Sequence, residues 1–191
     1  MATINQHNQE IYYNLNIWRS KPLLRKIYKH FYNQINKEID TSLSGSIVEL
    51  GSGIGNLKST IQNCITTDIF PNPWIDQTED AYSLSFHNQS VSHLILFDVF
   101  HHLEYPGEAL KEFHRVLVPK GRLIIFDPYI SLLSYFIYEF FHHEPVKYFS
   151  SIQWSAPKKT HLKKGSYYAA QSNASRIFFK RKYKHLLNSW H

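Results

Sequence analysis

The sequence predicts an α/β protein with a doubly wound, mostly parallel sheet and helices on both faces. Strand-like apolar runs alternate with helical patterns between residues 46 and 128. The first run, residues 46–50, ends in three glycines spaced two apart, which permit a tight turn and a close approach of the backbone to a ligand. An acid, Asp68, ends the second run 17 residues beyond Gly51. At 191 residues the chain is long enough for one domain with a proper core.

The N-terminal part differs from the rest in composition. Residues 1–15 are polar and rich in Asn and Gln, and we expect them to be loose or to act as an adaptable lid. Apolar side chains between Ile17 and Ile39 recur every three or four residues, which predicts an amphipathic helix with Pro22 near its start. We therefore interpret residues 1–45 as an N-terminal helical lid.

The remaining elements follow in an alternating order. We expect a short helix at 56–62, a strand at 65–69, a rigid loop at 71–76 that leads into a brief extended segment, a strand at 91–99, a helix at 106–117 and a strand at 122–126. Residues 46–128 would then form the core. Residues 129–191 would form an aromatic and basic, mainly helical C-terminal segment.

The glycine-rich turn departs from two phosphate-binding loops. A P-loop requires glycine directly before Lys-Ser/Thr, and here Leu57 precedes Lys58 and Ser59. The dinucleotide fingerprint requires Gly or Ala three residues after its second glycine, and that position is Asn56. Two interpretations of the loop remain, a site for a ligand without a phosphate cradle and a purely structural strand-to-helix turn.

Two motifs carry a resemblance to a known family. The loop Gly51-x-Gly53-x-Gly55, with Glu49 just before it, resembles motif I of the class I S-adenosylmethionine (SAM) dependent methyltransferases. The stretch H-H-L-E-x-P-x-x-A-L-x-E-x-x-R-V-L-x-P-x-G-x-L-I-I, which starts at His101, resembles the later half of the methyltransferase type 11 group. This resemblance implies a Rossmann-like fold, SAM as the methyl donor and S-adenosylhomocysteine as the product.

The resemblance also implies a set of cofactor-binding positions. They are Glu49, Gly51, Ser52, Gly53, Gly55, Asp68, Ile69, Asp80, Ala81, Asp98 and Phe100. The glycine loop with Glu49 would hold the methionine part of SAM, and Asp80 with Ala81 would hold the adenine. Asp68 would hold the ribose, as acids at this place do in strand-helix-strand nucleotide folds.

Some of these positions have an equally good structural explanation. Asp80 also fits a helix or turn cap, and Ser85 stands where the family usually has proline. Ile69 and Phe70 either pack on the adenine plane or belong to the core. Asp98 and Phe100 would line the methyl-transfer end of the site.

Adjacent histidines follow the fourth expected strand. If the methyl acceptor is a hydroxyl, a base must remove its proton, and histidine is the usual choice; His101 and His102 are the catalytic candidates. Neighbouring side chains point different ways, so we expect at most one to face the pocket. His142 and His143, beside Glu144, form a second pair. We expect no metal, because adjacent histidines cannot easily share one ion and the sequence signals no third ligand.

Charge is distributed unevenly along the chain. Residues 1–144 hold 11 Lys/Arg and 15 Asp/Glu, a net charge of −4, whereas residues 145–191 hold 10 Lys/Arg and no acid, a net charge of +10. The basic tail could contact a lipid headgroup or nucleic acid, or be a solvated helix face. With one cysteine, no signal-peptide pattern and no apolar run long enough to cross a bilayer, we expect a cytoplasmic protein.

Three functions remain open from the sequence. The first is a methyltransferase acting on a small-molecule or a lipid- or sugar-linked acceptor. The second is a nucleic-acid methyltransferase that uses the basic tail, although the Pro-Pro-Tyr/Phe motif of amino-group methylases is missing. The third is an inactive, truncated relative, since no good pair of strands follows Phe126. In that case the strand ending there would be an exposed edge through which the protein could oligomerise.

Overall fold

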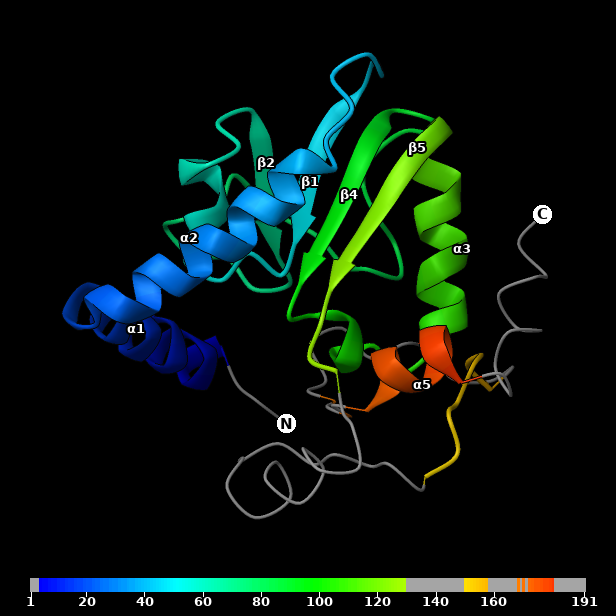
Figure 1. Cartoon of the computed structure of the whole chain (residues 1–191). Helices are drawn as coiled ribbons and strands as arrows, with labels where there is room; N and C mark the ends of the chain where they lie inside the picture. Colours follow the sequence, from blue (N-terminus) through cyan, green and yellow to red (C-terminus); the bar gives the residue numbers. More distant parts are fainter. Residues whose placement is uncertain (1–3, 130–149, 158–167, 169, 171, 181–191) are drawn as a thin grey trace.

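The protein is built around one parallel sheet. The computed structural model describes residues 4–129, 150–157, 168, 170 and 172–180 (Figure 1). Its strands are β1 (Ser46–Leu50), β2 (Cys64–Asp68), β3 (Gln77–Thr78), β4 (Val91–Phe97) and β5 (Leu117–Phe126). They pair in the order β3-β2-β1-β4-β5, and every pair is parallel. The strand order reverses between β1 and β4, which is where open parallel sheets bind ligands at their carboxyl ends.

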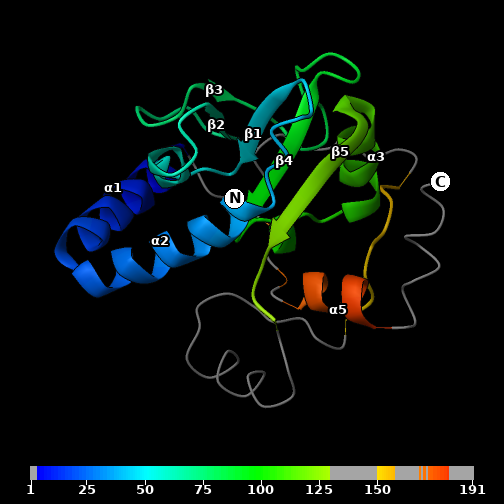
Figure 2. The same cartoon turned by 45° about the horizontal axis from the view of Figure 1, so that its top comes forward.

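Helices cover both faces of this sheet. They are α1 (Ile4–Ser20), α2 (Pro22–Lys37), α3 (Pro106–Val116) and α5 (Asn173–Phe179), with short 3₁₀ turns η1 (Asn56–Ser59) and η2 (Phe100–His102). Figures 1 and 2 show α1 and α2 on one side and α3 and α5 on the other. Ile47 packs into the core on the α2 side and Val48 into the core on the α3 and α5 side, as alternation along a strand requires. The predicted fold class is confirmed.

Aromatic rings join α2 to the last two strands. The rings of Tyr28, Phe31 and Tyr32 lie 5.4, 6.3 and 5.4 Å from the ring of Phe97 on β4. Phe97 stacks on Phe126 of β5 at 5.2 Å and 10°. Such ring pairs add to the free energy gained by burial. They fix α2 against the sheet.

The expectation of a loose N-terminus was wrong for residues 4–15. These residues belong to α1, and Ile11 is 4% exposed while the Tyr12 ring meets the Trp74 ring edge-on at 5.5 Å. The expected helix from Ile17 is divided at Lys21, because the residue before Pro22 disfavours helical geometry. Arg25 donates two hydrogen bonds of 2.7 Å to the last carbonyls of α1 and so holds the two helices together.

Only parts of the C-terminal region are described. β5 begins at Leu117 and not at residue 122 as expected, and its pairing with β4 is irregular between Val91 and His93. Residues 150–157 have no regular structure, and α5 is a helix within the segment 129–191 that we expected to be mainly helical. The aromatic stretch 130–149, with His142, His143 and Glu144, lies outside the described residues, as do most of the basic tail and the place of any later strands. β5 is the outermost strand of the described sheet.

In the part of the chain that the structure describes, no helix is long and apolar enough to cross a membrane.

The contact between α3 and residue 154 provides a test of this packing. The Gly107 N–H donates a 2.9 Å hydrogen bond to the Trp154 carbonyl, and a Cβ on Gly107 would collide with the indole of Trp154. Alanine is favoured over glycine in helices by about 1 kcal/mol. We nevertheless expect Gly107→Ala to lower the free energy of unfolding by about 2 kcal/mol, because Trp154 must be displaced. Denaturant unfolding followed by circular dichroism measures this.

The matched control is Lys111→Ala on the same helix, whose side chain is 67% exposed and whose removal should change stability by less than about 0.5 kcal/mol. A more stable Gly107→Ala variant would contradict the packing of residue 154 on α3.

Candidate active site

The glycine-rich turn at the end of β1 adopts a backbone that needs glycine. Gly51, Gly53 and Gly55 have φ angles of 69°, 53° and 65°, in the left-handed region. A Cβ would collide with Val99 at Gly51 and with the Trp74 carbonyl at Gly55, whereas no atom lies within 4 Å of a Cβ built at Gly53. Packing therefore explains two of the glycines. The third borders open space.

Hydrogen bonds tie this turn to the end of β2. The Ser52 N–H donates to the Thr67 carbonyl at 2.7 Å, and the Thr67 N–H donates to Ser52 Oγ at 3.0 Å. The Gly53 N–H donates to Asp68 Oδ2 at 3.0 Å. Asp68 is only 7% exposed. The structure thus places the predicted ribose-binding acid directly against the glycine turn.

Glu49 is a buried acid beneath the same turn. Its residue is 4% exposed, and its Oε2 atom has no hydrogen-bond partner. Burial, together with the charge of Asp68, raises the pKa of Glu49 to about 7, against the smaller opposing effect of a hydrogen bond with Ser52. Buried polar atoms are normally satisfied, so an unsatisfied carboxylate oxygen indicates a place for a ligand donor. A cationic amine would suit it best.

The loop after β2 folds back over the glycine turn. Asn72 Nδ2 donates to the Gly53 carbonyl at 3.2 Å. Asp76 forms a 2.6 Å ion pair with Lys58 of η1 and accepts the Thr66 N–H at 2.9 Å. Ile69, next to Asp68, stays 43% exposed. The loop is therefore anchored at its far end and exposes an apolar side chain beside the ribose candidate.

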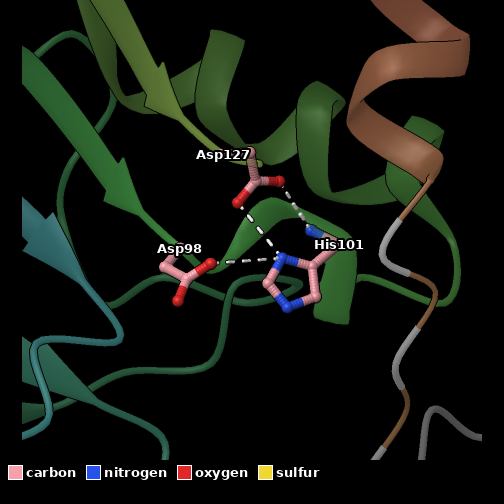
Figure 3. Close-up of side chains that lie close together, drawn as sticks. All are labelled: Asp98, His101 and Asp127. Atoms are coloured by element: carbon pink, nitrogen blue, oxygen red, sulfur yellow. Dashed lines mark hydrogen bonds and ion pairs between the residues drawn. The ribbon is translucent and has the colours of Figure 1, made fainter. Parts of the chain in front are cut away.

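Three side chains meet at the carboxyl ends of β4 and β5 (Figure 3). His101 Nδ1 lies 3.2 Å from Asp127 Oδ1 and 3.9 Å from Asp98 Oδ1. The His101 backbone N–H donates to the other Asp127 oxygen at 3.0 Å. The side chains of His101 and Asp127 are 1% and 2% exposed, whereas that of Asp98 is 51% exposed. Asp98 is the accessible member of this group.

Part of the chain is similar to known methyltransferases. Residues 48–125 match the family described as a methyltransferase domain. This segment is therefore a methyltransferase domain by its family match. The chain is also similar to an uncharacterized methyltransferase of Oceanobacillus iheyensis, at 27% identity over 118 residues that cover 53% of this chain and 55% of the relative. The chain thus spans about half the length of that relative.

The chain also resembles solved structures. A SAM-dependent methyltransferase of Thermotoga maritima, described as a possible histamine N-methyltransferase, superposes with a TM-score of 0.50 at 19% identity, covering 61% of this chain and 59% of that one. A putative SAM-dependent methyltransferase of Methanococcus maripaludis gives a TM-score of 0.49 at 14% identity, covering 65% and 64%. At 19% identity, the Thermotoga likeness shows a shared fold.

Hydrogen bonds of Asp80 and of its neighbour Glu79 hold the segment that was predicted to bind adenine. Asp80 Oδ1 accepts the Tyr82 N–H at 3.0 Å, which is the turn-cap arrangement. Glu79, 7% exposed, accepts the Ser85 N–H at 2.8 Å and also the Ser85 hydroxyl. Proline has no N–H, so serine at position 85 makes a bond that the usual proline would exclude. Ala81 packs at the edge of the core.

Phe100 and His102, the residues on either side of His101, contact the C-terminal part of the chain. Phe100 is fully buried and its ring lies 5.2 Å from that of Phe178. His102 Nδ1 lies 2.8 Å from the Tyr168 carbonyl oxygen. Of the two adjacent histidines, His101 is therefore the one that joins the acidic pair.

Sequence reasoning missed Asp127. It follows β5 as Asp98 follows β4, and the carboxyl ends of neighbouring parallel strands lie together, so the position of both acids was the available signal. The expectation of no metal assumed no third ligand, yet His101, Asp98 and Asp127 offer donor atoms within 4.8 Å of one another. His101 Nδ1 and Asp127 already share a proton in a hydrogen bond, and a metal ion bound by both would have to displace it. We therefore interpret the group as a hydrogen-bonded cluster and not as a metal site.

The pKa of Glu49 leads to a prediction about stability. Because the pKa is raised from 4.5 to about 7, the folded protein binds this proton more tightly than the unfolded chain does. Its contribution to stability is present below pH 4.5 and is lost as the pH rises through about 7. We expect Glu49→Gln to raise the free energy of unfolding by on the order of 3 kcal/mol at alkaline pH and much less in mild acid. Denaturant unfolding at both pH values measures this.

The exposed Glu38, whose side chain is 65% exposed, provides the control, and Glu38→Gln should show little effect at either pH. Equal stabilisation by Glu49→Gln at both pH values would show that charge burial is not its cause.

Proposed function

We propose that the protein is a SAM-dependent methyltransferase. The observation that carries this proposal is the unsatisfied, buried carboxylate of Glu49 beneath a glycine turn whose Gly53 borders open space. A zwitterionic amino acid end with an ammonium group would satisfy Glu49, and a glycine at position 53 lets the backbone approach it. Membership of residues 48–125 in the methyltransferase family supports the same ligand.

The neighbouring residues suit the rest of the cofactor. Asp68 would accept hydrogen bonds from the ribose hydroxyls, since carboxylate oxygens accept more than one bond each. Ile69, exposed beside it, and the Asp80-Ala81 turn would border the adenine. When bound, SAM supplies a methyl group already activated by a positive sulfur. The protein's task is then to position and orient the reactants.

We place the methyl acceptor at Asp98. Asp98 follows β4 at the point where the strand order reverses, and it is the exposed member of its group. His101 would act as a positioning residue there rather than as the base first predicted, because its side chain is 1% exposed and is bonded to Asp127. Asp98 would accept the proton from a hydroxyl or amine acceptor.

The acceptor itself would have an apolar part. A hollow of about 400 Å³ between β5 and α5 extends from Asp127 and is lined mainly by apolar side chains, including Ile125, Phe126 and Phe178. Such hollows with a few polar groups at one end are typical of small-molecule sites. A small-molecule or lipid-linked acceptor with an apolar portion fits this better than a nucleic acid does.

The test is calorimetric titration with SAM and with S-adenosylhomocysteine. We expect the wild type to bind both. Asp68→Asn, which keeps the side-chain shape, should weaken binding at least tenfold through the loss of charged hydrogen bonds. Gly53→Ala should also weaken binding at least tenfold, because its methyl group would occupy the ligand's space, while its cost in stability stays near the 1 kcal/mol of backbone strain.

Lys111→Gln on the far helix α3 is the control and should bind like the wild type. A folded wild-type protein that binds neither compound would contradict the proposal and favour the inactive relative. Binding that Gly53→Ala and Asp68→Asn leave unchanged would place the cofactor elsewhere.

A further inference from the structure

Helix α2 presents to solvent a face that the cofactor site does not use. Leu23 is 70% exposed and Ile27 is 41% exposed. Because they are four residues apart, their side chains lie on the same side of the helix. They form a short aliphatic ridge on the outside of the protein. Figures 1 and 2 show that this helix lies across the sheet from α3 and α5.

Basic side chains flank this ridge. Between residues 11 and 37 the chain has no Asp or Glu and six basic residues, which are Arg19, Lys21, Arg25, Lys26, Lys29 and Lys37. Lys21, Lys26, Lys29 and His30 are exposed. Among the residues that the structure describes, the three lysines have no carboxylate within ion-pairing distance. We call Lys21, Leu23, Lys26, Ile27, Lys29 and His30 the α2 outer face.

The opposite side of α2 makes this face a preformed surface. Tyr32 and Ile35 are 5% and 2% exposed and pack in the core, and Tyr28 and Phe31 contact Phe97. The Arg25 guanidinium is hydrogen-bonded to the end of α1. The helix is therefore held firmly from beneath, and the α2 outer face needs little ordering when a partner binds.

We propose that the α2 outer face docks the protein on an anionic lipid surface. The lysines would lie among the headgroups while Leu23 and Ile27 enter the boundary between headgroups and acyl chains, as in interfacial amphipathic helices. α2 would lie on the bilayer and not cross it. Nucleic acid would use the lysines through its phosphates but would leave the aliphatic ridge without a partner. The ridge therefore favours lipid.

This surface is independent of the basic tail and of the cofactor site. The basic tail, residues 145–191, is a separate candidate for contact with an anionic partner, whereas the proposed surface lies between residues 21 and 30. None of its side chains contacts the glycine turn, Asp68 or Asp98 among the contacts of the described residues. Lipid binding can therefore be tested even if SAM binding fails, and the two failures are distinguishable.

The experiment is flotation of the full chain with vesicles of phosphatidylcholine alone or mixed with phosphatidylglycerol. We expect binding to the mixed vesicles only, weakened by added salt. Lys26→Gln should lower the affinity about fivefold, and Lys26→Gln with Lys29→Gln about 30-fold, from roughly 1 kcal/mol per lysine near an anionic surface. Leu23→Gln with Ile27→Gln should lower it at least tenfold.

Lys111→Gln removes the same charge as Lys26→Gln from an exposed position on α3 and should bind the mixed vesicles like the wild type. Each variant should keep the wild-type circular dichroism and unfolding midpoint, because the changed side chains are exposed. Equal binding to neutral vesicles, or no vesicle binding at all, would overturn the proposal.

Two further outcomes would assign the anion binding elsewhere. Mixed-vesicle binding that all α2 variants retain would place the contact in another segment, such as the basic tail. Tight binding to a short RNA duplex that depends on Lys26 and Lys29 but not on Leu23 and Ile27, without vesicle binding, would replace lipid by nucleic acid.

Discussion

The candidate site depends on the hydrogen bonds that join the ends of β1 and β2. Ser52 and Thr67 exchange two bonds, and the Gly53 N–H holds the Asp68 carboxylate. These contacts bring a turn, a buried acid and the predicted ribose acid into one place. Parallel strands make this possible because their carboxyl ends lie along one edge of the sheet. The loop over the turn is held in the same way, through Asn72 and Asp76.

Burial of acids is the recurring chemical feature of this edge. Glu49, Asp68 and Asp127 each lie in or beside the site with little exposure. Asp68 and Asp127 are compensated by backbone N–H groups, whereas one oxygen of Glu49 is not. A charge without a partner in an apolar setting is costly to the folded state. The folded protein therefore carries a cost at Glu49 that a bound cation would offset.

The helices on the two sides of the sheet have different relations to solvent. α3 and α5 pack against strands and against the segment at residues 150–157. α2 packs with one aromatic face and leaves the other basic and partly aliphatic. One helix thus both completes the core and presents the proposed lipid surface, while the accessible Asp98 lies at the carboxyl edge of the sheet. If the protein docked on lipid through α2, the carboxyl edge of the sheet would take no part in that contact.

Much of the core could be predicted from the sequence because local signals were strong there. The glycine spacing, the acid at Asp68 and the apolar runs at β1, β2 and β4 predicted the succession of strands along the chain and the position of the turn. The proline before Leu23 predicted a helix start. The helical order of residues 4–15 could not be predicted, because polar composition conceals the burial of Ile11 and the ring contact between Tyr12 and Trp74.

The sequence by itself determined the class of fold, the glycine turn and the positions of most acids at the candidate site. Only the tertiary structure decided which groups meet. Asp127 lies beside His101 and Asp98 because β4 and β5, which α3 separates in the chain, are neighbours in the sheet. Likewise, burial of Glu49 and exposure of Leu23 depend on what the rest of the chain covers. Local patterns encode elements, whereas burial and side-chain pairing arise from contacts between residues far apart in sequence.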